Sequence, residues 1–211
     1  MGVAERRERE KEQRRNDIID AAEKIFFAKG INAATMDEVA EEAELSKGTL
    51  YLYFNSKEEL YLAINARGLL ILQKVFTEAI KKAAKGIDKL RQIWEAYFKY
   101  YEDYPDYFDA MVYYDLNEIK LDKEGTCAGE CRDQGLQVLD TVATAIGTGI
   151  KDGSFRKELN PMNAAMVLWA HTTGVIQILS RKGKHLEEEH GISLQDMIDL
   201  SWVMVKRLVA N

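Results

Sequence analysis

Hydrogen-bond donors gather between residues 46 and 53 of the chain. Five side chains there end in a hydroxyl, an ammonium or a phenol group: Ser46, Lys47, Thr49, Tyr51 and Tyr53. Phosphate oxygens of nucleic acids accept hydrogen bonds from such groups. Gly48 stands among them, and a residue without a Cβ lets the backbone approach another surface closely. The chemistry indicated is recognition of a polyanion by positioned donors.

Two short helices joined by a tight turn are expected to position these donors. Thr35 and Glu38 form a capping box, in which a hydroxyl and a carboxylate each satisfy a backbone N–H at a helix start. Ser46 is a favourable N-cap for the second helix, whose inner face would hold Leu50 and Phe54. The pattern is typical of a DNA-reading helix-turn-helix, although an ordinary antiparallel helix pair with a polar face shares it.

Helices on both sides support the first interpretation. An upstream helix has apolar residues at helical spacing and closes at a glycine: Ile18, Ala22, Ile25, Phe26 and Gly30. Downstream, Ser56 and Glu59 predict a second capping box. Lys57 then lies at a helix N-terminus, where free N–H groups already attract anions, so a phosphate contact is expected.

The segment IIDAAEKIFFAKGINAATMDEVAEEAELSKGTLYLYFNSKEELYLAI resembles the N-terminal DNA-binding domain of the TetR family of bacterial transcriptional regulators. The resemblance covers about residues 15 to 64, and its combination of motifs is highly specific. It implies phosphate contacts for five positions: Thr35, Thr49, Tyr51, Tyr53 and Lys57. It implies positions at or near base edges for Ser46, Lys47 and Gly48. The position of Tyr53 is often histidine in the family, which is a departure here.

The acidic charge balance of the chain disfavours DNA binding. The net charge is -6, and residues 1 to 60 hold ten Lys and Arg against fourteen Asp and Glu. An acidic protein still binds a polyanion when its cations cluster on one face. No signal peptide or long apolar run is visible, so a cytoplasmic protein without a membrane partner is expected. Two cysteines make no disulfide framework.

Residues 1 to 15 are almost entirely charged. One interpretation is a solvated helical extension or frayed tail with Arg and Glu paired four residues apart. The other is an arm that carries Arg14, Arg15 and Arg9 to DNA phosphates or the minor groove. The interleaved glutamates weaken the second interpretation.

The rest of the chain has helical periodicity and no strand pattern, so we predict an all-α fold. The expected helices span residues 57–84, 87–103, 106–117, 127–151, 161–182 and 193–209. Asn160 as N-cap and Pro161 at the first helical position start the fifth of these. We expect a charged extension (1–15), a three-helix helix-turn-helix domain (16–60) and a larger helical domain for ligand binding and dimerisation (61–211).

The last two expected helices carry apolar sets too broad for one core stripe. A homodimer interface explains the width, with seven candidates: Val167, Val175, Ile178, Leu194, Ile198, Trp202 and Val205. A helix pair buried wholly within one subunit explains it too. The resemblance implies a four-helix bundle across a two-fold axis. Two recognition helices about 34–36 Å apart then enter successive major-groove faces of a palindrome.

Residues 97–115 concentrate seven of the ten tyrosines. Rings with polar tips suit a pocket for an apolar or amphipathic effector, and they equally suit a core. Nine residues are candidates for the pocket wall: Trp94, Tyr97, Phe98, Tyr101, Phe108, Met111, Val112, Trp169 and His171. A lone histidine on an apolar helix is more often part of a hydrogen-bonded core than a ligand contact.

Signals for metals, cofactors and catalysis are weak. Cys127 and Cys131 could share a helix face, and Glu187 with His190 forms a single E-x-x-H, but neither pair completes a metal site. No catalytic signature appears, so an enzyme is not expected. Two functions remain: a dimeric repressor that a small molecule releases from a double-stranded operator, or an architectural DNA-binding protein without such a switch.

Overall fold

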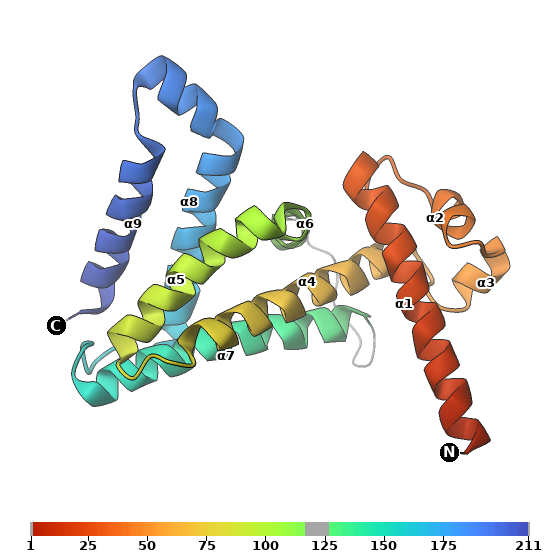
Figure 1. Ribbon diagram of the computed structural model, residues 1–211, viewed down its shortest axis with the longest axis horizontal. Coiled ribbons are helices and arrows are strands. Elements are labelled where there is room, and N and C mark those ends of the chain that lie inside the picture. Colours follow the sequence, from red (N-terminus) through yellow and green to blue (C-terminus); the bar gives the residue numbers. More distant parts are fainter. Residues whose placement is uncertain (1, 117–126, 211) are drawn as a thin grey trace. The chain divides into compact units, whose positions relative to one another are not determined.

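The computed structural model describes residues 2–116 and 127–210, and their regular structure is helical, as predicted (Figure 1). The helices are α1 (Val3–Lys29), α2 (Met36–Glu42), α3 (Lys47–Tyr51), α4 (Lys57–Ile80), α5 (Gly86–Asp103), α6 (Pro105–Leu116), α7 (Cys127–Asp152), α8 (Pro161–His190) and α9 (Leu194–Val209). An isolated bridge joins Phe155 and Ala210. Residue 117, the expected end of the helix that starts near 106, lies outside the described residues. None of the described helices is long and apolar enough to cross a membrane.

The chain divides into two compact units. Unit 1 comprises Met1–Leu69 and Asp106–Asp133, and unit 2 comprises Leu70–Pro105 and Gln134–Asn211. The helix-turn-helix therefore shares a unit with α6 and with the first turns of α7. Helices α4 and α7 each contribute to both units. The boundary at residue 60 that the sequence suggested stays a prediction.

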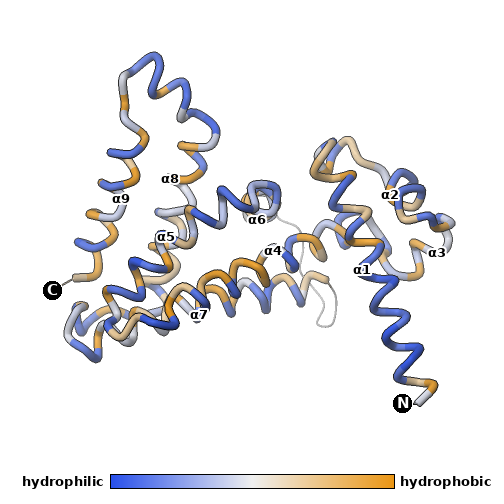
Figure 2. The backbone as a smooth tube through the Cα atoms, in the orientation of Figure 1, coloured by the Kyte–Doolittle hydropathy of each residue, from blue (hydrophilic) through white to orange (hydrophobic). Residues whose placement is uncertain are grey.

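The core of unit 1 forms where the expected apolar stripes meet. Ile18, Ala22 and Phe26 of α1 are buried, as are Leu50 and Phe54 on the inner side of the helix-turn-helix. Burial of each large apolar side chain stabilises the fold by roughly 1.5–3 kcal/mol relative to exposure. The charged start of α1 continues the helix away from this core as a hydrophilic stretch (Figure 2). Arg6 and Glu10 pair there at 2.7 Å, which agrees with the expectation of a solvated helical extension.

Helix α8 is longer than predicted. It continues past residue 182 to His190, because Gly183 is a packing position and not a stop. A Cβ on Gly183 would lie 3.1 Å from the side chain of Leu194, so the small residue lets α9 approach. Gly191, with a φ of 62°, is the residue that ends the helix. The expected start is confirmed, since the side chain of Asn160 accepts from the N–H of Asn163.

Two glycines bring α5 and α7 together in unit 2. A Cβ built on Gly86 would lie 2.2 Å from the Cα of Gly149, so any side chain at Gly86 would collide with backbone. Asp152 accepts a hydrogen bond from the Gly86 N–H at 2.7 Å and caps the junction. Hydrogen bonds from Ser154 and from the Gly86 N–H hold the pKa of Asp152 below its usual value.

Candidate DNA interface and internal cavity

The first helix of the helix-turn-helix starts as the sequence predicts. Thr35 Oγ1 accepts a hydrogen bond from the N–H of Glu38 at 3.3 Å, and Glu38 Oε2 accepts from the N–H of Thr35 at 3.0 Å. Lys29 pairs with the same carboxylate at 2.6 Å. Lys29, the N–H of Thr35 and the hydroxyl of Thr35 all donate to this carboxylate and hold the pKa of Glu38 below its usual value. The side chain of Glu38 thus joins the end of α1 to the start of α2.

The turn between α2 and α3 is a Schellman motif with an unusual residue. The N–H of Leu45 bonds to the carbonyl of Ala40 at 2.8 Å, and that of Glu44 bonds to the carbonyl of Glu41 at 3.0 Å. Glu44 has a φ of 54°, in the left-handed region where glycine is usual. A side chain there costs roughly 1–2 kcal/mol relative to the right-handed region. The two backbone hydrogen bonds of the motif form despite this local preference.

The second helix, α3, is capped by two of the predicted donors. Ser46 Oγ accepts from the N–H of Thr49 at 3.1 Å, and the two hydroxyls lie 2.8 Å apart in a hydrogen bond. Thr49 is half-buried, whereas Ser46 is exposed. These hydroxyls therefore stabilise the start of α3 even without DNA. A DNA contact would be a second role.

The remaining predicted donors of α3 differ in exposure. Lys47 and Gly48 are exposed and Tyr51 is 40% exposed, whereas Tyr53 is half-buried. Leu52, which the sequence did not single out, is 82% exposed beside them. A Cβ on Gly48 would meet only Ser46 Oγ, at 3.9 Å, so the fold itself does not require glycine there.

Lys47 is engaged by an acidic neighbour. Its ammonium lies 2.6 Å from Asp37 Oδ1 of α2, and this hydrogen bond raises the pKa of Lys47. Both side chains are exposed, so the pair contributes little to stability. A phosphate or base that takes up Lys47 has to compete with this carboxylate.

Lys57 lies at the start of α4, as predicted, and serves the fold there. Its Nζ donates to the carbonyl oxygens of Asn32 and Ala34 at 3.3 and 3.1 Å, which fixes the loop between α1 and α2. Ser56 caps α4 through the N–H of Glu59 at 3.1 Å. The return bond of the expected capping box differs, because Glu59 accepts from Asn55. The phosphate contact of Lys57 stays a prediction.

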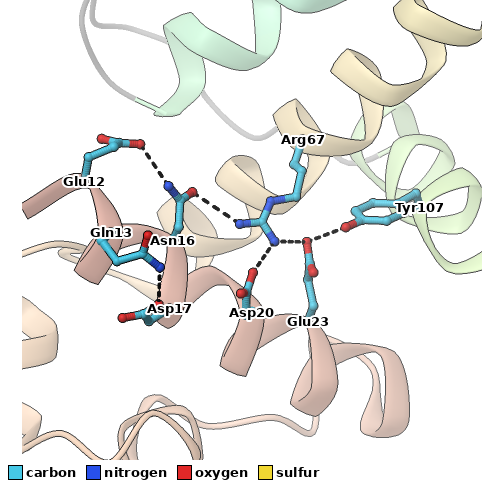
Figure 3. A network of polar contacts seen from close by, with 8 residues as sticks. All are labelled: Glu12, Gln13, Asn16, Asp17, Asp20, Glu23, Arg67 and Tyr107. Atoms are coloured by element: carbon cyan, nitrogen blue, oxygen red, sulfur yellow. Dashed lines mark hydrogen bonds and ion pairs between the residues drawn. The ribbon is translucent and has the colours of Figure 1, made fainter. Parts of the chain in front are cut away.

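A polar network that the sequence did not reveal ties three helices of unit 1 together (Figure 3). Arg67 of α4 lies 2.6 Å from Asp20 and 3.0 Å from Glu23, both on α1, and donates to Asn16 Oδ1 at 3.3 Å. Tyr107 of α6 donates to Glu23 at 2.6 Å. Burial raises the pKa of Glu23, while the bonds from Tyr107 and Arg67 oppose the shift. No local sequence pattern predicts this network, because its residues lie far apart in the sequence.

Unit 2 holds a narrow apolar cavity with an open volume of about 30 Å³. Helices α4, α5, α7, α8 and α9 supply its wall: Phe76, Leu90, Ile93, Trp94, Tyr97, Val138, Leu139, Val142, Leu168, Trp169, Thr172 and Val205. Three of the predicted pocket residues, Trp94, Tyr97 and Trp169, are in this lining. The lining residues from α4 and α7 were not predicted, because they occupy ordinary core positions in the sequence pattern.

The other predicted pocket residues lie elsewhere. Phe98, Tyr101 and His171 belong to unit 2 but are absent from the cavity lining. Three more belong to unit 1, where they are buried in its core: Phe108, Met111 and Val112. The aromatic run is divided after residue 105, where the chain passes from unit 2 to unit 1. Its residues therefore belong to two different units.

Polar groups in and near the cavity are few. Tyr97 and Thr173 share a hydrogen bond of 2.8 Å between their hydroxyls, and Thr172 donates to the carbonyl of Leu168 at 2.9 Å. Trp94 Nε1 is buried and has no hydrogen-bond partner among the described residues, and the same holds for His171 Nδ1. A buried donor without a partner costs free energy, so the indole N–H of Trp94 favours a visiting acceptor.

The outward faces of α8 and α9 carry apolar side chains. Val167 and Ile178, both predicted for a dimer interface, are 58% and 42% exposed. Val175, Leu194, Ile198 and Trp202 are half-buried. Val205 is 1% exposed and lines the cavity, so it is not accessible to a second subunit and its prediction was wrong. The exposed apolar residues of α9 lie outside the seven interface candidates: Leu200, Val203, Met204 and Leu208.

Trp202 also faces its own subunit in part. Its ring lies 5.7 Å from that of Trp94, and the guanidinium of Arg91 lies 5.7 Å from its centroid. A substitution at Trp202 would therefore disturb α5 as well as any contact with a second subunit.

The cysteines are held inside unit 1. Cys127 accepts a hydrogen bond from Arg15 at 3.5 Å, and Cys131 accepts from Asn65 at 3.1 Å. Both thiols are buried, and burial raises the pKa of Cys127. Among the described residues no group of three or more His, Cys, Asp or Glu side chains is arranged to hold a metal ion.

A capped helix-turn-helix with an exposed donor face, joined to a larger set of helices, defines a helix-turn-helix transcriptional regulator. Residues 18–64 match the family model described as bacterial regulatory proteins, tetR family. The DNA-binding segment of the chain, which contains the helix-turn-helix, is therefore that of the tetR family.

Individual relatives agree with this assignment. The transcriptional activator FasR of Mycolicibacterium smegmatis is 37% identical over 92 residues, which span 44% of this chain and 42% of that protein. The match thus covers less than half of that relative. The transcriptional repressor KstR2 of Rhodococcus jostii is 27% identical over 71% of this chain and 72% of its own. The fold also resembles the Bacillus subtilis regulator FadR, solved in complex with stearoyl-CoA, with a TM-score of 0.64 and 16% identity over 90% of this chain and 96% of that one.

Proposed function

We propose that this regulator is a repressor that binds a palindromic operator as a homodimer and is released when a small apolar or amphipathic molecule enters the cavity of unit 2. The apolar cavity with the unpartnered indole N–H of Trp94 carries this proposal. The buried indole N–H without a partner, in a residue of an apolar cavity wall, favours the ligand-responsive function over an architectural DNA-binding protein.

The small volume of the cavity suggests how release would work. About 30 Å³ is far below the roughly 300–1,000 Å³ of ligand pockets, so an effector requires a shape in which the wall helices stand further apart. An effector shifts the balance only by its different affinity for the two shapes. Helix α4 starts at Lys57 beside the helix-turn-helix and reaches the cavity wall with Phe76, so it is the natural connection.

The solved complex of FadR with stearoyl-CoA suggests the first class of effector to try. An operator would be selected from random double-stranded DNA, and its affinity measured by fluorescence anisotropy with and without long-chain acyl-CoA and free fatty acid. We expect an active effector to weaken operator binding roughly 5- to 150-fold, the usual range of allosteric coupling. The relatives include an activator and a repressor. A reporter gene downstream of the operator would therefore show whether this regulator represses or activates transcription.

A cavity-filling variant sharpens the test. Val142→Leu should keep operator binding and weaken the response to effector, because the added methylene group occupies part of the small cavity. Leu136→Ile, at an exposed position of the same helix, is the control and should keep the response. A full response in Val142→Leu would place the effector elsewhere.

A further inference from the structure

A second hollow lies within unit 2, between the segment that precedes α8, the first turns of α8 and the end of α9. Its volume is about 410 Å³, within the roughly 300–1,000 Å³ of ligand pockets. We refer to it as the Arg156 hollow. It shares Leu168 with the narrow cavity, and the two linings otherwise differ. Apolar side chains make up most of its wall: Leu159, Ala164, Val167, Leu168, Leu208 and Val209.

Arg156 is the cation of this hollow, and the fold fixes its position. Phe155, the residue before it, is buried and pairs with Ala210 in the isolated bridge. The Arg156 N–H donates to the carbonyl of Val209 at 3.0 Å, and its Nη2 donates to the carbonyl of Leu208. The guanidinium is therefore held at the end of α9 before any ligand binds. Such preorganisation lowers the free-energy cost of binding.

The Nε–H of Arg156 is a donor without an acceptor. The side chain is half-buried, its Nε is buried without a hydrogen-bond partner, and it forms no ion pair with the described residues. A buried donor left unpaired costs roughly 1–3 kcal/mol, and more when it is charged. The start of α8 offers an anion less, because Asn160 Oδ1 already accepts the N–H of Asn163. A carboxylate placed at Nε would satisfy the donor and pair with the charge.

The remaining lining residues restrict which anion fits. Glu158 places a carboxylate in the wall, but its side chain is exposed, and water screens its repulsion of an anion. Inorganic phosphate gains nothing from the apolar wall. An alkyl chain gains roughly 25 cal/mol for each Å² of apolar surface that it removes from water. The hollow therefore favours an anion that carries an alkyl chain.

We propose that the Arg156 hollow binds a small aliphatic carboxylic acid in its ionised form. The carboxylate accepts from the Nε–H of Arg156, and the alkyl chain covers Val167 and Leu208, which are 58% and 42% exposed in one subunit. Because Val167 is also a candidate for the dimer interface, binding has to be measured on the full chain in its own oligomeric state. The site is additional to the effector cavity and does not depend on the proposed function.

Hexanoate and hexanamide test the charge requirement, because the amide has the same chain and nearly the same shape without the negative charge. Binding to the full chain would be followed by NMR with ¹⁵N-labelled arginine and tryptophan, and the Nε–H resonance of Arg156 would be assigned through Arg156→Lys. We expect hexanoate to shift this resonance and to bind roughly tenfold more tightly than hexanamide.

Three outcomes of this titration would overturn the proposal. The first is equal binding of hexanoate and hexanamide. The second is an unmoved Arg156 resonance, which a partner subunit filling the hollow would also produce. The third is a shift confined to the indole N–H of Trp94, which would place the acid in the effector cavity and leave the proposed function standing. Phosphate at the same concentration should leave the Arg156 resonance unchanged, and an equal shift with phosphate would contradict a site built for an alkyl chain.

Variants test the location by calorimetric titration with hexanoate. Arg156→Gln should weaken binding roughly tenfold. Lys157→Gln removes the same charge from the adjacent exposed residue, which lies outside the lining, and should bind like the parent chain. Glu158→Gln alters an exposed side chain, so the unfolding midpoint should hold while binding tightens several-fold. Equal affinities of Arg156→Gln and Lys157→Gln, or weaker binding by Glu158→Gln, would overturn the proposal.

Discussion

The phenol of Tyr107 donates a 2.6 Å hydrogen bond to Glu23, and this bond joins α6 to α1 (Figure 3). Arg67 of α4 lies 3.0 Å from the same carboxylate. One carboxylate therefore connects three helices around the helix-turn-helix. Since α6 contacts α1 in this way, the position of the DNA-binding helices depends on residues from much later in the chain.

Tyr107→Phe should lower the free energy of unfolding by about 1–2 kcal/mol at neutral pH, because a hydrogen bond to a charged group is lost. Burial already raises the folded-state pKa of Glu23, so the folded chain binds this proton more tightly than the unfolded chain. The stability contribution of Glu23 therefore falls as pH rises from its unfolded pKa through its folded pKa. Loss of the Tyr107 donor raises the folded pKa further. Denaturant unfolding should show a larger effect of the variant at neutral than at mildly acidic pH, and an equal effect would exclude the charged bond.

Glu44→Gly should stabilise the chain by roughly 0.5–1 kcal/mol, because glycine adopts the left-handed conformation of this turn without the Cβ penalty. Glu41→Gly removes the same charge from a helical position of α2 and should destabilise by about 1 kcal/mol. Opposite shifts of the unfolding midpoint are expected. A loss of stability in both variants would show that the Glu44 side chain makes a compensating contact.

Gly48→Ala should separate folding from DNA binding. The fold has room for the methyl group, and alanine favours helix by roughly 0.5–1 kcal/mol, so the unfolding midpoint should hold or rise. Operator affinity should fall about tenfold if DNA approaches this backbone closely. Gly147→Ala in α7, where a Cβ also meets nothing, is the control and should leave operator affinity unchanged. If Gly48→Ala bound the operator as tightly as the parent chain, DNA would not approach this backbone closely.

Lys47 and Asp37 should have opposite effects on operator binding. Lys47→Ala should weaken binding and, if the ammonium reaches a phosphate, reduce the salt slope by about one unit. Asp37→Asn frees Lys47 from its 2.6 Å ion pair and removes a negative charge, so binding at low salt should tighten several-fold. Anisotropy titrations over a series of salt concentrations measure both quantities. A weaker complex with Asp37→Asn would mean that the ion pair orients Lys47 for DNA.

Leu200→Asp combined with Met204→Asp should convert the expected dimer to monomers in sedimentation analysis. Both side chains are exposed on α9, so their own subunit should stay folded. Leu136→Asp, an exposed apolar position on α7, is the control and should leave the oligomeric state unchanged. A double variant that sediments as a dimer would move the subunit contact away from α9.

Local signals in the sequence predicted several helix starts in both units. Thr35, Ser46 and Asn160 were expected to cap helices, and all three accept the expected backbone hydrogen bond. Capping joins residues only three positions apart, so the residue types suffice to predict it. The predicted end of α8 at residue 182 was wrong, because the helix runs to His190 and packs Gly183 against Leu194 before it ends at Gly191.

The sequence by itself determined the all-α class, most helix boundaries and the helix-turn-helix of the tetR family, because capping, periodicity and motif spacing act over a few residues. Tertiary structure alone decided which broad apolar faces turn inward. It buried Val205 in the cavity wall, gave Met111 to the other unit and engaged Lys57 with loop carbonyls. These outcomes depend on contacts between residues far apart in the chain, and a helix that is apolar on two sides does not specify which side meets its own core.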